Sequence, residues 1–260
     1  TRSGYAKQGG RPVEEVFREF REHGISILAS MIVGFPYQTP EIVQQELEGL
    51  IALKPTLGQF LIYGPVPGTP FYERVMKEDL LRDDLRAEPE KYYRVADGFA
   101  SMVKHPTMSP GQIEALQEHC FREDFRLLGP SIYRTIETWL NGYLKLREHS
   151  NPLLRKKAER YALDLRTAYP VFLAGRILGP SPSVRAWIGE LQKRVHEALG
   201  EATWAQRLTS AGAVGMAAWT FILGSISVAS ITELFVGQHN GAGEYTQTAV
   251  PVWQMIWLSL

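Results

Sequence analysis

The stretch ISILASMIVGF, residues 25–35, decides the fold of this chain. It is a nearly unbroken apolar run rich in β-branched residues, which is typical of a strand buried on both faces of a parallel sheet. Gly24 stands directly before it and would end a helix over residues 12–23, where apolar residues recur at helical spacing. These residues therefore predict a helix followed by a buried strand.

The next residues repeat this alternation. Thr39 and Pro40 begin a second predicted helix, which ends at Lys54 and Pro55. A second apolar run, residues 57–63, has the length of a strand and is followed by turn residues. Helices that alternate with strands indicate an α/β fold with parallel strands, as in a barrel or a doubly wound sheet. Two strands would leave sheet edges and apolar surface exposed, so we expect further strands from outside this sequence.

The rest of the chain has a different character. Residues 77–110 are charged and interrupted by Pro89, so we expect a connecting segment. Residues 111–200 carry several apolar patterns at helical spacing. The expected fold class is thus α/β, with a partial (β/α) barrel segment over residues 1–76 and a mostly α-helical C-terminal extension.

The last part of the chain lacks charge over a long stretch. No charged residue occurs in 208–232, which exceeds the roughly 20 residues that a helix needs to cross hydrocarbon. Glycines and hydroxyl residues dilute its apolarity, so a membrane span, a buried helical hairpin and a spurious readthrough tail are three open interpretations. Basic residues precede the stretch and would place the body of a spanning protein on the cytoplasmic side. Residues 233–260 form an apolar tail that we expect to be truncated.

The net charge and the cysteine content make some functions of this chain improbable and exclude others. The chain has 28 Lys and Arg against 28 Asp and Glu, so its formal charge is zero and nucleic acid is not an expected partner. Its single cysteine excludes an internal disulfide and any multi-cysteine metal site made by this chain alone, which fits a cytoplasmic location. Cys120 has core spacing on a predicted helix, so we expect a buried small hydrophobe.

Two strings that follow the predicted strands carry a resemblance. They are SMIVGFPYQTPE, residues 30–41, and YGPVPGTPFY, residues 63–72. In this order they resemble segments of radical S-adenosylmethionine (radical SAM) enzymes, and the layout is closest to the members that carry a cobalamin-binding (B12) domain. The resemblance covers about residues 4–75. Gln38 stands where the family usually has glutamate, and the first string alone could be a plain strand-to-helix turn.

The resemblance implies cofactors, partners and a reaction. Radical SAM enzymes cleave S-adenosylmethionine reductively to a 5′-deoxyadenosyl radical, using a 4Fe-4S cluster held by three cysteines and an external electron donor. Cobalamin is a candidate further cofactor, with methyl transfer as the outcome. The substrate would be an unidentified small or lipid-like molecule. Because the cluster cysteines are missing, we expect this chain alone to be inactive.

The resemblance also implies a partial cofactor site. Ile32, Val33 and Gly34 would line the adenine through backbone and apolar contact, with Leu61 and Tyr63 nearby. No catalytic residue and no metal ligand is assigned.

Other residues have two interpretations each. Tyr63 and Tyr72 could reach a substrate or pack in the protein. His105 could be a ligand, although a lone loop histidine is more often a structural hydrogen-bond partner.

Two other functions are open. An ordinary α/β-barrel lyase or transferase is weakly supported, because no glycine-rich phosphate loop opens either predicted helix. A non-catalytic scaffold or membrane-associated helical module, residues 98–260, fused to an α/β barrel is the second alternative.

Overall fold

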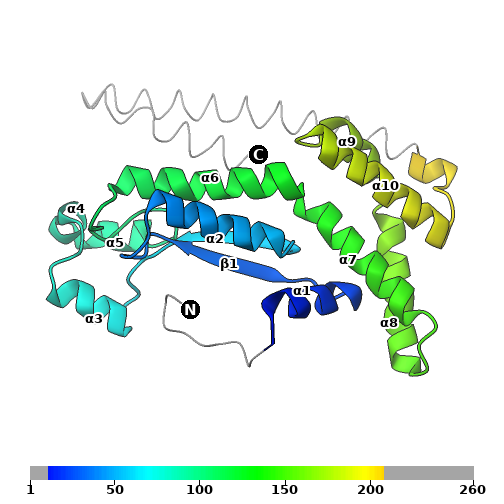
Figure 1. Cartoon of the computed structure of the whole chain (residues 1–260), viewed down its shortest axis with the longest axis horizontal. Coiled ribbons are helices and arrows are strands. Elements are labelled where there is room, and N and C mark those ends of the chain that lie inside the picture. Colours follow the sequence, from blue (N-terminus) through cyan, green and yellow to red (C-terminus); the bar gives the residue numbers. More distant parts are fainter. Residues whose placement is uncertain (1–10, 208–260) are drawn as a thin grey trace.

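The computed structural model describes residues 11–207, and within them the protein is mostly helical with one two-stranded parallel sheet (Figure 1). The first four elements are α1 (Val13–Glu22), β1 (Leu28–Val33), α2 (Pro40–Ala52) and β2 (Leu57–Ile62). The predicted order of helix, strand, helix and strand is therefore confirmed. The two strands pair in register from Leu28 opposite Leu57 to Val33 opposite Ile62.

Local chemistry explains where α2 begins. The Thr39 side chain accepts a hydrogen bond from the Ile42 N–H, and Pro40 occupies the first turn. A hydroxyl at this position satisfies one backbone N–H group that has no partner inside the helix, and a proline there removes another. The loop between β1 and α2 is therefore short and well defined.

Within the described residues, helices cover one face of the sheet only. Met31 and Val33 on β1 and Phe60 and Ile62 on β2 pack against α2 and α6 (Pro110–Leu128). On the opposite face, Leu28, Ile32 and Leu57 are 59%, 38% and 40% exposed. The expectation of a strand buried on both faces is wrong for this part of the chain, because no element of residues 11–207 covers the second face. We call it the open face.

The connecting segment is folded as short helices. These are α3 (Pro70–Lys77), α4 (Asp83–Ala87) and α5 (Pro89–Val95). They share a small apolar core, and an isolated bridge joins Leu81 to Val103. The segment then returns to the sheet, where the Ile62 N–H donates to the Gly98 carbonyl at 2.8 Å. It thus lies against the edge of β2 that β1 leaves unpaired.

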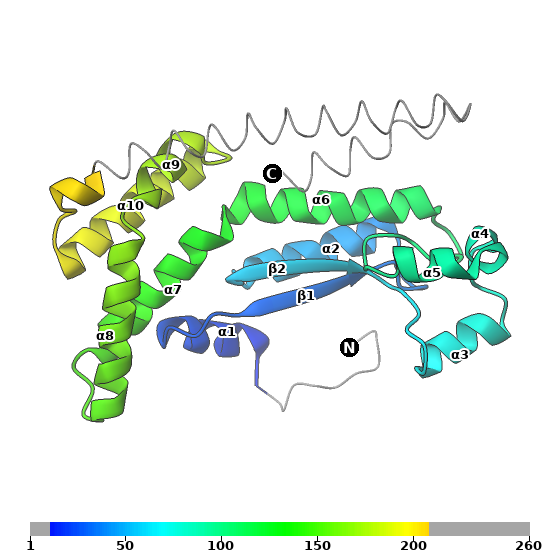
Figure 2. The same cartoon turned by 180° about the vertical axis from the view of Figure 1, so that it is seen from behind.

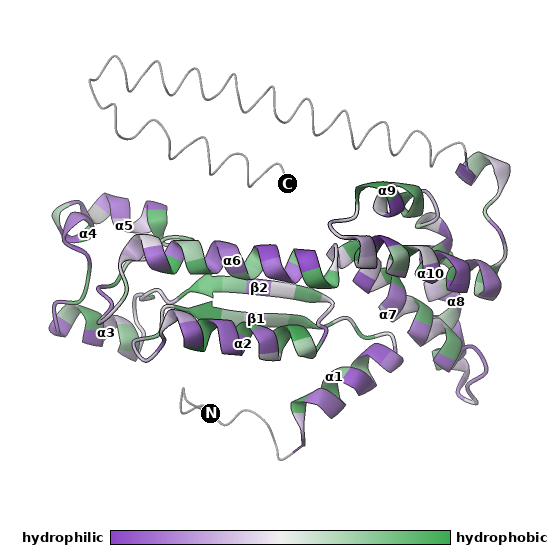
Figure 3. Ribbon diagram, turned by 45° about the horizontal axis from the view of Figure 1, so that its top comes forward, coloured by the Kyte–Doolittle hydropathy of each residue, from purple (hydrophilic) through white to green (hydrophobic). Residues whose placement is uncertain are grey.

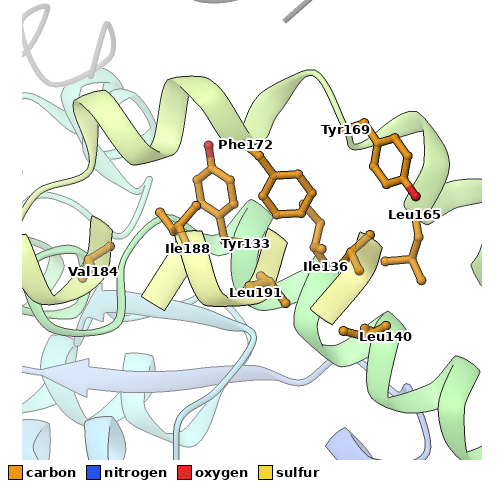
Figure 4. Close-up of a cluster of buried hydrophobic side chains, with 10 residues drawn as sticks. Tyr133, Ile136, Leu140, Leu165, Tyr169, Phe172, Val184, Ile188 and Leu191 are labelled. Carbon is orange, nitrogen blue, oxygen red and sulfur yellow. The ribbon is translucent and has the colours of Figure 1, made fainter. Parts of the chain in front are cut away.

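The remaining helices form a bundle with its own core. They are α7 (Ser131–Leu146), α8 (Pro152–Thr167), α9 (Val171–Leu178) and α10 (Pro182–Leu199). Figure 4 shows side chains from these helices, Tyr133, Leu140, Phe172 and Ile188 among them, converging in one apolar cluster. The helix α6 falls in the range expected as an extension, yet it packs on the sheet, so it belongs to both parts of the fold.

The bundle holds the amino-terminal end of β1. Figures 1 and 2 both show α1 beside α7. The Tyr161 hydroxyl on α8 donates to the Gly24 carbonyl at 2.7 Å, and a Cβ on Gly142 would lie 2.5 Å from the Gly24 Cα. Glycines at both positions permit this close approach.

None of the helices that the structure describes includes the stretch predicted as a candidate membrane span. Every helix within residues 11–207 falls short of the length and apolarity that a membrane span requires. The candidate span 208–232 and the tail 233–260 lie outside the described residues.

Candidate functional site

The two motif strings meet at the carboxyl end of the sheet. Since β1 and β2 are parallel, the loop after Val33 and the loop after Ile62 emerge at the same edge. Four rings from these loops and the start of α3 are in contact, and we call them the aromatic ladder: Tyr37, Phe35, Tyr63 and Phe71.

The outer pairs of the ladder, Tyr37 with Phe35 and Tyr63 with Phe71, are stacked, and the central pair, Phe35 with Tyr63, is tilted by 42°. The ring centroids of Phe35 and Tyr63 are 4.4 Å apart, and those of Tyr63 and Phe71 are 3.9 Å apart with an interplanar angle of 21°. The Arg74 guanidinium lies 5.5 Å from the Phe71 centroid, within range of a cation–π contact. The ladder therefore joins two loops that are about 30 residues apart in sequence into one surface.

Gln38 organises the first loop. Its side chain is 1% exposed, and its Oε1 accepts from the N–H groups of Gly34 and Phe35 at 2.7 and 2.8 Å. Its Nε2 donates to the Ile32 carbonyl at 3.0 Å and to Glu46 Oε2 at 2.7 Å. An ionised glutamate could accept the first two bonds but could not donate the other two. The bonds to Glu46 and to the end of β1 thus explain a glutamine at a position where the resemblance suggests glutamate.

The backbone conformation and the packing around Gly34 both favour a glycine. Its φ of +93° disfavours residues with a side chain, and an added Cβ would lie 3.1 Å from Ile113 Cγ2 on α6. The predicted contact of Gly34 with an adenine stays a prediction.

The predicted site residues separate onto two faces. Ile32 and Leu61 are paired across the strands and lie on the open face near the ladder. Val33 points the other way and is completely buried against α2 and α6, while its carbonyl accepts from the Tyr63 N–H at 2.7 Å. The predicted apolar contact of the Val33 side chain with an adenine is therefore wrong, because side chains alternate between the faces of a strand, while its predicted backbone contact stays a prediction.

Tyr63 and Tyr72 also occupy different surroundings. Tyr63 belongs to the ladder, between Phe35 and Phe71. Tyr72 packs in the small core of the connecting segment, edge-on to Tyr92 with centroids 6.2 Å apart. Of the two tyrosines proposed to reach a substrate, only Tyr63 belongs to the aromatic ladder.

A small pocket lies behind the ladder. It has a volume of about 80 Å³, and its lining includes Tyr63, Phe71, Arg74, Lys104 and His105. Sites for drug-sized ligands are usually about 300–1,000 Å³, so this pocket is too small for a nucleoside. A nucleoside site would need the open face of the sheet.

His105 is a structural residue. Its Nδ1 accepts from the N–H groups of Thr107 and Met108 at 3.2 and 3.1 Å. The neutral ring must then carry its proton on Nε2, which lies 2.9 Å from the Phe35 carbonyl and donates to it. Both nitrogens thus tie the loop before α6 to the first motif loop, and neither is available to a metal.

The described residues do not offer an iron site. They contain no cluster of three or more metal-ligating side chains. Cys120 is fully buried, and desolvation raises the pKa of its thiol to about 12. A protonated, inaccessible thiol is a poor ligand for iron, and three thiolates are needed. The cluster implied by the resemblance does not fit the residues of this chain.

Comparisons of this chain with known protein families, curated proteins and solved structures found no similar protein. No family model matches the chain, and searches of the curated proteins and of the solved structures gave no match.

One buried ion pair near the other end of the sheet was not predicted. Arg134 donates to both oxygens of Asp124, at 3.0 and 2.7 Å, and to the Pro55 carbonyl at 3.1 Å. The two side chains are only 10% and 9% exposed. A Cβ on Gly58 would lie 3.0 Å from Asp124 Oδ1, so the glycine in β2 makes room for the carboxylate. The glycine within β2 was the feature of the sequence that could have indicated this pair, because a glycine inside a strand often marks a place where another group approaches closely.

Proposed function

We propose that this chain is the C-terminal part of a radical SAM enzyme and that it contributes part of the adenine side of the S-adenosylmethionine site. The observation that carries the proposal is the meeting of the two motif loops at the carboxyl end of a parallel β–α–β unit. Ligands of α/β sheets bind at the carboxyl ends of the strands. The chain alone would be inactive, since it cannot hold the cluster.

The open face supports a larger sheet. In a closed barrel, helices cover the outer face of each strand and the inner face packs against other strands. Here Met31, Val33, Phe60 and Ile62 contact helices, whereas no helix of residues 11–207 covers Ile32 on the other face, and Leu61 borders Gly98 at the edge of the sheet. On that face the Ser30 hydroxyl donates to Gln59 Oε1 at 2.9 Å, a polar pair between apolar neighbours. We infer that this face is the inside of a barrel completed by further strands.

The chemistry of the proposed adenine contact is simple. Ile32 and Leu61 are adjacent branched side chains next to the ladder, and such a surface suits a flat heterocycle. Gln38 holds the loop at the end of β1 from within, as a positioning residue. S-adenosylmethionine bound there would supply the radical precursor, and cobalamin-dependent methyl transfer is the downstream reaction proposed. No step of that chemistry is assigned to the residues of this chain.

The experiment is to read the coding sequence upstream and to express the longer protein anaerobically with a reconstituted cluster. We expect three cysteines in the spacing Cys-x-x-x-Cys-x-x-Cys and formation of 5′-deoxyadenosine on reduction. Ile32→Gln should raise the KM for S-adenosylmethionine. The matched control is Leu28→Gln, on the same face of β1 but four residues away, roughly 13 Å at 3.3 Å per residue. An upstream sequence without the cysteines would remove the proposal.

A further inference from the structure

The outward surface of α8 combines basic and apolar side chains. This helix buries Ala158, Tyr161, Ala162 and Leu165. On the opposite side, five exposed residues recur at intervals of three, one, three and three positions, which brings them to one face. We call them the α8 outer face: Leu153, Lys156, Lys157, Arg160 and Leu163. Leu153 is 73% exposed and Leu163 is 52% exposed, so two large apolar side chains stand among three cations.

Positive charge is concentrated around this face. Between residues 145 and 160 there are six Lys and Arg and two Asp and Glu, a net charge of +4, in a chain whose formal net charge is zero. This excess of positive charge creates a local field at the surface. The negative charges that make the whole chain neutral lie farther away, and salt screens their effect. The region therefore attracts anions even though the whole protein does not.

Several of these cations are available to a partner. Lys156 makes no hydrogen bond or ion pair within residues 11–207. Lys157 lies over the Tyr161 ring at 5.5 Å, a contact that leaves the ammonium at the surface. Arg160 has a partly exposed ion pair with Asp164 at 3.3 Å. By contrast, Arg155 donates to two carbonyls of the preceding loop and serves to hold that loop.

The face is also placed where a broad partner can reach it. Figures 1 and 2 show the turn between α7 and α8 at the margin of the molecule, away from the sheet. Figure 3 shows hydrophilic and hydrophobic residues side by side along α8. A flat partner could therefore approach the helix without meeting the α/β part.

We propose that the α8 outer face binds the surface of an anionic lipid bilayer. Basic side chains attract acidic headgroups, and their aliphatic stems allow neighbouring leucines to enter the interface. A nucleic acid would gain from the cations, but it would leave both leucines in water and find no aromatic ring on this face to stack on. Leu153, at the first turn of the helix, is the side chain that distinguishes the two partners.

The test uses the full chain and sedimentation with phosphatidylcholine vesicles, with and without phosphatidylglycerol. Binding should require the acidic lipid and weaken with salt. Each lysine near the surface contributes about 1 kcal/mol, so K156Q/K157Q should bind about 25-fold more weakly. Leu153→Ser should also weaken binding to acidic vesicles. The matched control, R94Q/K193Q, removes two exposed charges from α5 and α10 and should bind like the unchanged protein.

Other outcomes would overturn the proposal. One is that the protein binds neutral vesicles as strongly as acidic ones, and another is that R94Q/K193Q loses as much binding as K156Q/K157Q. A third is that K156Q/K157Q binds as strongly as the unchanged protein, which would assign the lipid contact to another part of the chain. If duplex DNA binds with the same dependence on Lys156 and Lys157 but not on Leu153, the face is a polyanion site and the lipid assignment fails. The inference does not rest on the radical SAM proposal, because neither S-adenosylmethionine nor a cluster enters the measurement.

Discussion

Replacing Gln38 by glutamate tests how the first motif loop is held. Q38E keeps the shape of the side chain and both acceptor bonds from Gly34 and Phe35. It removes the two donor bonds, to the Ile32 carbonyl and to Glu46. Two carboxylates would then face each other at a position where the wild-type atoms are 2.7 Å apart, in a side chain that is 1% exposed.

The expected loss of stability follows from these contacts. A hydrogen bond to a neutral group contributes about 1 kcal/mol and one to a charged group about 1.5–3 kcal/mol. Repulsion between the carboxylates adds to this, although uptake of a proton limits it. We expect Q38E to lower the free energy of unfolding by about 3–4 kcal/mol at pH 8, a large share of the stability of a typical domain.

The loss should depend on pH. Burial and Glu46 would raise the pKa of the introduced carboxyl in the folded state above its value in the unfolded chain, near 4.3. The folded state then binds more protons than the unfolded state, so stability falls as pH rises. Urea denaturation followed by circular dichroism should therefore show a smaller deficit for Q38E at pH 5 than at pH 8.

Two variants make the result decisive. Gln45→Glu adds the same charge to an exposed position of α2 and should change stability by less than about 0.5 kcal/mol. Adding Glu46→Gln to Q38E restores a donor and should recover about 1–2 kcal/mol. A deficit below about 1 kcal/mol at pH 8, or a deficit that shrinks as pH rises, would refute the hydrogen-bond account of Gln38.

Three further predictions concern the packed residues around the sheet. Arg134→Leu leaves the Asp124 carboxylate buried without its partner and should lower the free energy of unfolding, measured by urea denaturation, by about 3–5 kcal/mol. A negligible change would mean that the pair is hydrated in solution. Gly34→Ala should cost about 1–3 kcal/mol and lower the melting temperature, because of the positive φ and the contact with Ile113; an unchanged melting temperature would contradict it. The Cys120 thiol, with a pKa of about 12, should react with Ellman's reagent at pH 8 only as the protein unfolds, and rapid native labelling would argue against its burial.

Local patterns predicted the α/β part well. The order of elements and the parallel direction of the strands followed from nearby residues, whereas the bond from His105 to the Phe35 carbonyl decided between the two interpretations of that histidine. The burial of Cys120 followed from its spacing on a helix. The radical SAM identity and the cofactor contacts of Ile32, Gly34, Leu61 and Tyr63 stay predictions.

The candidate site was less predictable, because its residues owe their roles to distant partners. Val33 was expected to contact the adenine partly through its side chain, since an unbroken apolar run does not show which of its alternate residues meets a helix. The packing of Gly34 against Ile113 on α6 could not be predicted, since the two residues are far apart in sequence. The glutamine at position 38 had no explanation until Glu46 was placed beside it.

By itself, the sequence determined the first two helices and the two strands, and where two loops with distinctive motifs begin. These properties depend on residues a few positions apart, through capping, turn conformations and the periods of 3.6 and 2. Only the tertiary structure decided that α6 covers the sheet, that Asp124 meets Arg134 beneath Gly58, and that one face of β1 stays open. The apolar face of a helix or strand predicts that this face will be buried, but it does not specify the element that covers it. That element depends on how the whole chain packs.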